Sequence, residues 1–329
     1  MQPPTIKAAN GNSSIPDEVL ERFVDKYHGP APGPGAAQRL ERILRMARLS
    51  AAQASLIAEQ WRESDPVGFF AAVRHVLRTC PDEGEKELLR SMVTVEELLR
   101  ALADPGAFHR EDAVGLAREL QRHAPDVDVR LAKRFSVERG HGEDTSEAES
   151  VQRTLELIEA VACSERILPF LVRACRTTDY RIISKIALVA GRCAWGRGLV
   201  ARLLEDSEPR VRANAIEGLW ESGHFEDKRE MLWRAAKDAH HRVVVNALVG
   251  LARAGEQGAQ ERLEALAEHP SQMFRAAAAW GMGELRDPRF QEVLTRMYQK
   301  ETGNVRQNAL RALVRLRKAA AGGEPTAPD

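Results

Sequence analysis

One arrangement of apolar and polar positions recurs along the second half of the chain. A nine-residue segment with apolar residues at its first, fifth and ninth positions occurs four times, as VRANAIEGL (211–219), VVVNALVGL (243–251), FRAAAAWGM (274–282) and VRQNALRAL (305–313). Successive copies start 32, 31 and 31 residues apart, and a looser copy, IISKIALVA, starts 29 residues before the first. A fixed period of this size predicts a stacked array of repeats.

Each nine-residue segment follows another stretch in which apolar residues recur at helical spacing. These preceding stretches are residues 198–206, 228–238, 259–269 and 288–300. Short breaks such as DSEP and ELRDP separate the elements. Each repeat is therefore predicted to be a first helix (helix A), a tight turn and a second helix (helix B). Because nothing in this region alternates with the period of a strand, the sequence predicts an all-α fold.

Two positions of helix B hold small or amide side chains on the flank of the core face. The fourth and eighth positions lie one above the other on a helix, and two copies place Asn214 with Gly218 and Asn246 with Gly250 there. Glycine inside a helix costs about 0.5–1 kcal/mol relative to alanine, so a recurrent glycine indicates a packing requirement. We interpret these positions as contacts between neighbouring repeats, with each Asn bonded to its neighbour or to a turn. The alternative is a ladder of Asn side chains that binds a ligand.

The segment DSEPRVRANAIEGL resembles a HEAT repeat, and more narrowly the short bacterial repeats named after phycobilisome lyases, over roughly residues 180–318. The resemblance implies a right-handed α-solenoid of HEAT-like helix pairs with a repeat period of about 31 residues. It also implies a ladder of Asp and Arg side chains, for which Asp206 and Arg212 fit. Val244 replaces the arginine opposite Asp238, and Arg275 has no matching Asp. Proteins with such repeats are mostly interaction scaffolds.

The sequence outside these four repeats predicts several further segments. Residues 1–35 are predicted to form a flexible N-terminal arm, in which a short amphipathic helix precedes a Pro/Gly linker, GPAPGPG. This helix is expected to dock on the array, on a partner, or as a cap over the first repeat. We expect residues 36–136 to form degenerate HEAT-like helix pairs or a separate helical domain, and residues 137–150 a polar loop. Regular repeats are expected over residues 151–318, followed by a disordered tail at 319–329.

Composition narrows the class of partner and the compartment. Charged residues make up 29% of the chain and its formal net charge is zero, which disfavours nucleic acid as the main partner. The four cysteines lie in helix-patterned segments without metal-ligand spacing, as in proteins of a reducing compartment. The N-terminus lacks a signal-peptide pattern, and no apolar run approaches the ~20 residues that a membrane helix needs. We expect a cytoplasmic protein with no membrane segment.

No motif of catalysis or cofactor binding stands out, so we expect neither enzymatic activity nor a cofactor or metal. The adjacent His240 and His241 point about 100° apart on a helix, which favours a turn over a metal site. The architecture resembles the deoxyhypusine hydroxylases, but the His-Glu dipeptides of that family are absent. It also resembles the alkyl-purine DNA glycosylases, whose groove would use Trp280, so a nucleic-acid-binding protein is one alternative. A chromophore lyase is another, on the repeat name alone.

The positions of helix B opposite its core face are predicted to line the concave side of the array. An apolar patch there, formed by Val245, Val249, Met273 and Trp280, has arginines around it. Large apolar side chains on a solvated face indicate a partner site, in which Trp and Arg are frequent anchors. The alternative for the two valines is burial between adjacent B helices.

We therefore expect a protein–protein interaction scaffold or adaptor that holds a peptide or helix of another protein on its concave face. The candidate partner-binding residues are Leu188, Arg192, Arg242, Val245, Val249, Arg253, Met273, Trp280, Arg311 and Arg315.

Overall fold

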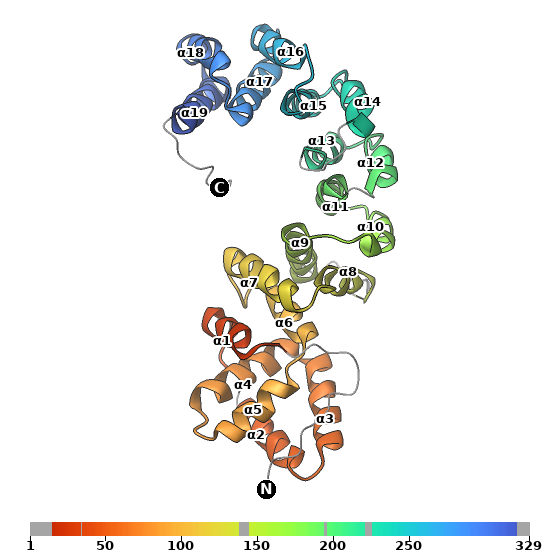
Figure 1. The fold of residues 1–329 in the computed structure, drawn as a ribbon, viewed down its shortest axis with the longest axis vertical. Coiled ribbons are helices and arrows are strands. Elements are labelled where there is room, and N and C mark those ends of the chain that lie inside the picture. The colour runs from red at the N-terminus through yellow and green to blue at the C-terminus, as the bar shows by residue number, and fades with distance from the viewer. Residues whose placement is uncertain (1–14, 34, 138–144, 194–195, 221–225, 321–329) are drawn as a thin grey trace. The chain divides into compact units, whose positions relative to one another are not determined.

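The computed structural model describes residues 15–33, 35–137, 145–193, 196–220 and 226–320. These residues form helices and turns, with no strand among them, which confirms the all-α class (Figure 1). The chain divides into two compact units, Met1–Arg173 (unit 1) and Ala174–Asp329 (unit 2). The division therefore falls after the polar loop that was expected at 137–150. Residues 138–144 lie outside the described part of the chain, and the expectation of a loop is wrong for residues 145–150, because they form the start of a helix. No helix in the described ranges has both the length and the apolar character needed to cross a membrane.

Unit 2 is a row of helix pairs. Its B helices are α11 (Tyr180–Arg192), α13 (Pro209–Gly218), α15 (His241–Arg253), α17 (Gln272–Leu285) and α19 (Gly303–Ala320). Its A helices are α12 (Arg197–Leu203), α14 (Glu226–Ala235), α16 (Ala259–Ala265) and α18 (Gln291–Lys300). Figure 1 shows the B helices along the inner side of the curved row and the A helices along its outer side. The α-solenoid predicted from the sequence is confirmed, while its right-handed sense and 31-residue period stay predictions.

Asparagine side chains tie successive B helices together. The side-chain amide of Asn214 donates to the carbonyl of Ser184 on the preceding B helix, at 3.1 Å. Asn246 donates to Ala213 at 3.1 Å, and Asn308 to Ala276 at 2.9 Å. In each case the fourth position of one helix bonds to the third position of the helix before it. The interpretation of these residues as stacking contacts is therefore confirmed.

Glycine lets the same helices approach closely. A Cβ placed on Gly218 would collide with the main-chain carbonyl of Leu188, and one on Gly191 would lie 2.7 Å from the Cα of Gly218. Consecutive B helices accordingly make more extensive contacts with one another than consecutive A helices do. Because one layer is drawn together more tightly than the other, the row curves with the B helices on its inside.

The arginine ladder differs from the expected one. Arg212 pairs with Asp238, at the end of the following A helix, through two bonds of 2.8 and 2.9 Å. It also donates to the main-chain carbonyls of Asp206, at 2.8 Å, and Ser207, at 3.2 Å, and not to the Asp206 carboxylate. Arg275 repeats the arrangement with Glu301 at 2.7 Å. A ladder along the stack is therefore present at Arg212 and Arg275, but each acidic partner comes from the next repeat, and the carboxylate of Asp206 does not pair with Arg212.

Unit 1 is helical as well. Its helices are α1 (Asp17–Lys26), α2 (Ala36–Ala47), α3 (Ala51–Ser64), α4 (Pro66–Thr79), α5 (Glu83–Met92), α6 (Val95–Leu102), α7 (Arg110–His123), α8 (Val127–Val137), α9 (Thr145–Ala160) and the start of α10 (Leu168–Ala174). Alternate helices contact each other, α2 with α4 and α4 with α6. This arrangement is compatible with the expected degenerate pairs, which stay a prediction for residues 36–136.

Helix α1 is part of the core of unit 1 and packs against α7. Phe23 and Tyr27 are buried, and both rings contact Phe108 edge-on, with centroids 6.0 and 5.7 Å apart. An ion pair of 2.7 Å joins Arg22 to Glu119 on α7. The expectation of a flexible arm is therefore wrong for α1, because its apolar face is covered within its own unit, while it stays a prediction for the Pro/Gly linker. Residues 1–14 lie outside the described part of the chain.

A buried carboxylate, Glu97, lies in the first turn of α6. It accepts a 2.7 Å hydrogen bond from the main-chain N–H of Thr94, which completes a capping box. The side chain of Arg62 pairs with it at 2.6 Å. Burial nevertheless raises the pKa of Glu97 to about 7, with Arg62 and the hydrogen bonds from Thr94 acting in the opposite direction.

Candidate partner-binding face

The candidate residues predicted from the sequence differ widely in exposure. Exposed side chains are Arg242, Arg253, Met273 and Arg311. Partly exposed ones are Arg192, Trp280 and Arg315, and buried ones are Leu188, Val245 and Val249. Met273, at the start of α17, is the most open of the apolar candidates, with 57% of its surface exposed.

Val245 and Val249 belong to the core of unit 2, where both are 0% exposed. A Cβ placed on Gly281 of α17 would lie 2.6 Å from Val245 and 3.2 Å from Val249, so α17 rests directly on them. Leu188 is covered in the same way by α13, which packs against α11. For Val245 and Val249 the structure shows the alternative, burial between adjacent B helices, and the expectation of an open wall is wrong for all three side chains because the next B helix covers them.

Two tryptophans from repeats that are not adjacent meet beside α15. The ring of Trp280, on α17, lies 6.1 Å from that of Trp220, which follows the end of α13. The indole N–H of Trp220 donates to the main-chain carbonyl of Asn246 on α15, at 2.9 Å. Gly250 makes room for this ring, since a Cβ there would lie 3.0 Å from it. The pair is thus positioned by α15, although neither ring belongs to that helix.

A chain of charges runs beside the tryptophans across three B helices. The guanidinium of Arg253, on α15, lies over the Trp220 ring at 4.6 Å and pairs with Glu284 of α17 at 3.7 Å. Glu284 also pairs with Arg315 of α19. Both arginines keep more than a third of their side-chain surface exposed. One carboxylate against two guanidinium groups leaves this part of the surface positively charged.

Comparison with known families settles the identity of this region. The family model of HEAT repeats matches residues 196–270 and 259–327. Residues 196–327 therefore contain HEAT repeats. No curated protein matches the chain. The matched residues lie within unit 2, begin after α11 and contain the tryptophan pair.

Two residues of this HEAT-repeat surface, Trp220 and Glu284, were absent from the candidates predicted from the sequence. Trp220 lies one residue beyond the nine-residue frame, and its partner Trp280 lies two repeats later. Glu284 stands at the eleventh position of the frame, which reads Arg253, Glu284 and Arg315 in successive repeats. That alternation of sign was the signal that could have identified the charge chain.

Two adjacent histidines of the HEAT repeats, His240 and His241, lie at the start of α15. His240 caps the N-terminus of α15, where its Nδ1 accepts the main-chain N–H of Arg242 at 3.3 Å. The ring of His241 packs on that of His240, with centroids 4.2 Å apart. Burial lowers the pKa of both imidazoles. In the described ranges no group of His, Cys, Asp or Glu side chains could hold a metal ion.

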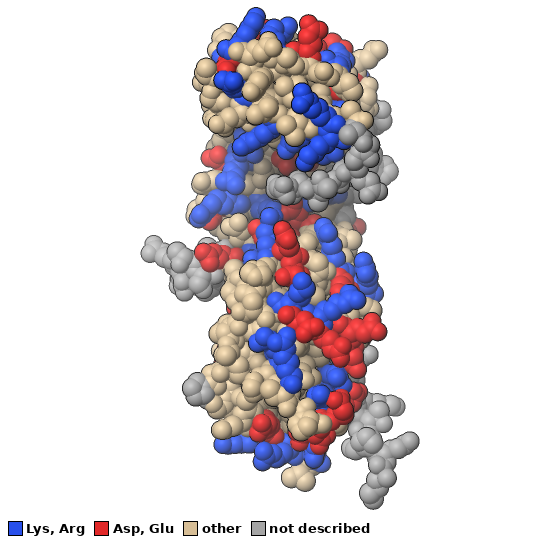
Figure 2. Space-filling model, turned by 90° about the vertical axis from the view of Figure 1, so that its left-hand side faces the viewer, with Lys and Arg blue, Asp and Glu red and all other residues tan. Residues whose placement is uncertain are grey.

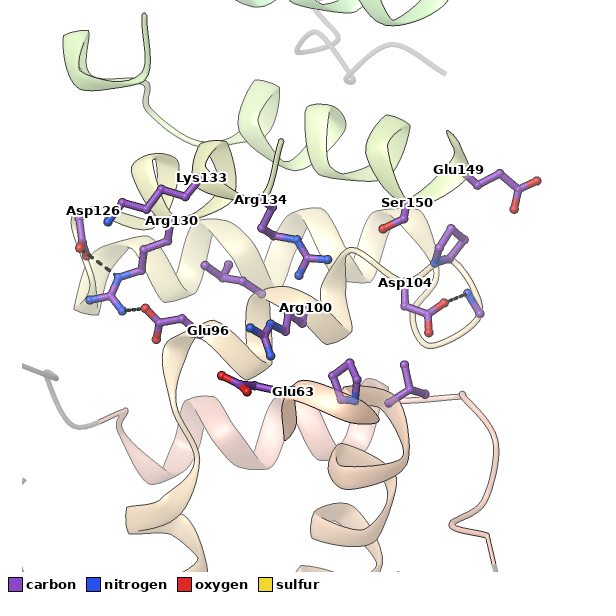
Figure 3. Close-up of a pocket in the computed structure, with 15 residues that line it drawn as sticks. Glu63, Glu96, Arg100, Asp104, Asp126, Arg130, Lys133, Arg134, Glu149 and Ser150 are labelled. Carbon is purple, nitrogen blue, oxygen red and sulfur yellow. Dashed lines mark hydrogen bonds and ion pairs between the residues drawn. The ribbon is translucent and has the colours of Figure 1, made fainter. Parts of the chain in front are cut away.

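A second candidate site is a cavity of about 770 Å³ in unit 1 (Figure 3). Arg100 on α6 and Arg134 on α8 point into it. Its charges are mixed, and several are already engaged: Arg130 pairs with Asp126 at 3.0 Å and with Glu96. Because cations and carboxylates alternate around the wall, this cavity favours no single sign of ligand.

Proposed function

We propose that the HEAT repeats of unit 2 form a protein-interaction scaffold whose inner face binds a helix or extended segment of a partner protein. Arrays of this kind present extended concave surfaces, and HEAT repeats commonly serve as interaction scaffolds. The proposed contact surface, named here the tryptophan face, consists of Trp220, Arg253, Trp280, Glu284 and Arg315. The tryptophan pair is the observation that carries the proposal.

The composition of the tryptophan face fits a binding hot spot. Tryptophan and arginine are the side chains most often responsible for binding energy when a partner covers them. The N–H of Trp220 already has its acceptor, the carbonyl of Asn246. A partner can therefore cover this ring without leaving an unpaired polar group, a defect that costs about 1–3 kcal/mol.

The arginines of the tryptophan face favour a partner that supplies carboxylates. Glu284 is shared between Arg253 and Arg315, so each guanidinium retains donors for a further acceptor. Arg253 also forms one wall of the aromatic surface, because its plane covers Trp220. The proposed partner segment therefore combines an apolar or aromatic anchor with acidic residues beside it.

The experiment compares Trp280→Ala with Trp233→Ala in the purified full chain. Trp233, on the outer helix α14, is also partly buried and also lies beneath an arginine, Arg262 at 4.6 Å. Proteins retained from a lysate of the source organism are quantified by mass spectrometry for the wild type and both variants. We expect Trp280→Ala to lose a specific set of partners at least tenfold and Trp233→Ala to retain them.

Equal retention by both variants would remove the tryptophan face from the proposal. The same preparations are tested for a salt-sensitive mobility shift of labelled DNA. Binding of DNA that depends on Arg253 and Arg315, without loss of protein partners in Trp280→Ala, would replace the proposal by a nucleic-acid function.

A further inference from the structure

The last helix pair of the array, α18 and α19, leaves uncovered the face on which a following repeat would stack. At the sixth position of the nine-residue frame, Ile216, Leu248 and Ala279 are buried. The corresponding Leu310 of α19 is 46% exposed, and Val314, one turn further, is 44% exposed. Two large apolar side chains therefore lie open side by side on one helix.

This end of the array contains a groove of about 380 Å³ between α18 and α19. Its α19 wall is apolar and includes Leu310, Leu313 and Val314. Its α18 wall carries uncharged polar side chains at helical spacing, Gln291, Thr295 and Gln299. A groove with one apolar wall and one neutral hydrogen-bonding wall is suited to the apolar stripe of a helix.

The rim of this groove is basic. Helix α19 contains five cationic residues and no acidic one, namely Arg306, Arg311, Arg315, Arg317 and Lys318. Arg315 pairs with Glu284, but within the described ranges Arg311, Arg317 and Lys318 form no ion pair. Figure 2 shows several Lys and Arg side chains beside uncharged surface at this end of the chain, at the top of the view, with a smaller group of Asp and Glu side chains nearby. The unpaired cations define the charge of a matching partner.

Three other occupants fit this end face poorly. The segment 321–329, AGGEPTAPD, has no large apolar side chain to fill the groove. A further repeat of the same kind would bury Gln307 and Arg311, which replace Val245 and Val249 at the third and seventh positions. A second copy docked by the same face would bring two sets of unpaired cations together.

From this apolar groove and its basic rim, we infer that the α18–α19 end face binds an amphipathic helix of a partner protein. The helix presents an apolar stripe to Leu310 and Val314 and carries carboxylates toward Arg311, Arg317 and Lys318. This site differs from the tryptophan face, because its apolar centre lies on the exposed end of the last repeat. The inference does not depend on whether the tryptophan face binds a partner.

The test uses the full chain and two synthetic 18-residue helical peptides with the same leucine stripe. One peptide carries Glu along both edges of the stripe and the other carries Lys, and binding is followed by fluorescence anisotropy. We expect the Glu peptide to bind at least tenfold more tightly than the Lys peptide, with an affinity that falls as salt rises. Leu310→Glu and Arg317→Glu should each weaken the binding of the Glu peptide at least tenfold.

Leu49→Glu is the matched control, since Leu49 is 91% exposed and lies in unit 1. It should bind the Glu peptide like the wild type, and circular dichroism should show the same helix content in all variants. Equal affinity for the two peptides, or no binding of either, would overturn the inference.

Two further measurements identify a different occupant. Light scattering that shows a wild-type dimer and a monomeric Leu310→Glu would assign the groove to a second copy. A tenfold gain in peptide affinity on removal of residues 321–329 would assign it to the chain's own C-terminal segment. Either result would overturn the inference that a helix of a partner protein occupies this groove.

Discussion

At the scale of single residues, the close approach of two B helices, α11 and α13, depends on the absence of a side chain at Gly218. A methyl group at Gly218 would collide with the carbonyl of Leu188. We expect Gly218→Ala to destabilise unit 2 by about 1–3 kcal/mol, because main chain cannot move aside as a side chain can. Gly115, exposed in the middle of α7, has open space around it and is the matched control.

Gly115→Ala should stabilise unit 1 by about 0.4–1 kcal/mol, since alanine restricts the unfolded chain and favours the helix. Urea unfolding followed by circular dichroism gives both changes. If Gly218→Ala left stability unchanged or raised it, as expected for Gly115→Ala, the space beside Gly218 would not limit how closely the B helices pack.

The protonation of Glu97 gives the second prediction at this scale. In the unfolded chain its carboxyl group ionises near the ordinary pKa of 4.5, whereas burial raises the folded pKa to about 7. The folded state therefore holds the proton longer, and the contribution of this group to stability falls as pH rises between these two values. We expect the free energy of unfolding of the wild type, relative to Glu97→Gln, to drop by about 2–3 kcal/mol from pH 4 to pH 8.

Urea titrations of both proteins across this pH range measure the difference. A difference that does not change with pH would mean that Glu97 has the same pKa in the folded and unfolded states, so that Arg62 and Thr94 fully offset the effect of burial.

Residue roles were predictable from the sequence where they depend on the helix itself. A helical wheel, which projects the residues of helix B along its axis, identified the asparagines and glycines of the stacking contacts, because their spacing along one helix is fixed. It failed for Val245 and Val249, since their burial depends on how closely α17 crosses α15. The wheel separates the core side of a helix from the other side, but it does not show how much of that other side a neighbour covers.

At the scale of helices, α1 provides the third prediction. Phe23 is fully buried against Phe108, so Phe23→Ala should cost unit 1 about 3–5 kcal/mol. Glu18, exposed on the same helix, is the control, and Glu18→Ala should change stability by less than about 0.5 kcal/mol. Hydrogen exchange should show faster exchange in α7 for the Phe23 variant alone. Unchanged stability and exchange would mean that α1 contributes nothing to the core.

The amphipathic pattern of α1 was recognised in the sequence, but its binding place was not. Proline and glycine between α1 and α2 suggested separation from the following helices. Yet the main-chain N–H of His28 bonds to the carbonyl of Ala107, which fixes the chain immediately after α1. Such a contact joins residues far apart in sequence and leaves no periodic signal, which is why helices were easier to predict than their neighbours.

At the scale of the whole molecule, the organisation of unit 2 determines how a local defect spreads. Each B helix contacts mainly the B helices before and after it, and each Asn bond spans one repeat. An array of this kind unfolds as coupled neighbours and not as one indivisible core. Damage at one repeat should therefore weaken adjacent repeats more than distant ones.

Hydrogen exchange of Gly218→Ala makes this expectation measurable. Loss of protection should be largest in α11, α13 and α15, smaller in α17 and smallest in α19, because stability passes through successive interfaces and each one attenuates the effect. Gly115→Ala, whose site lies in unit 1, should leave the exchange of all five helices unchanged. A uniform loss of protection from α11 to α19 would instead show that the HEAT repeats unfold as a single cooperative unit, and a partner helix bound at α19 would then stabilise the tryptophan face as strongly as its own site.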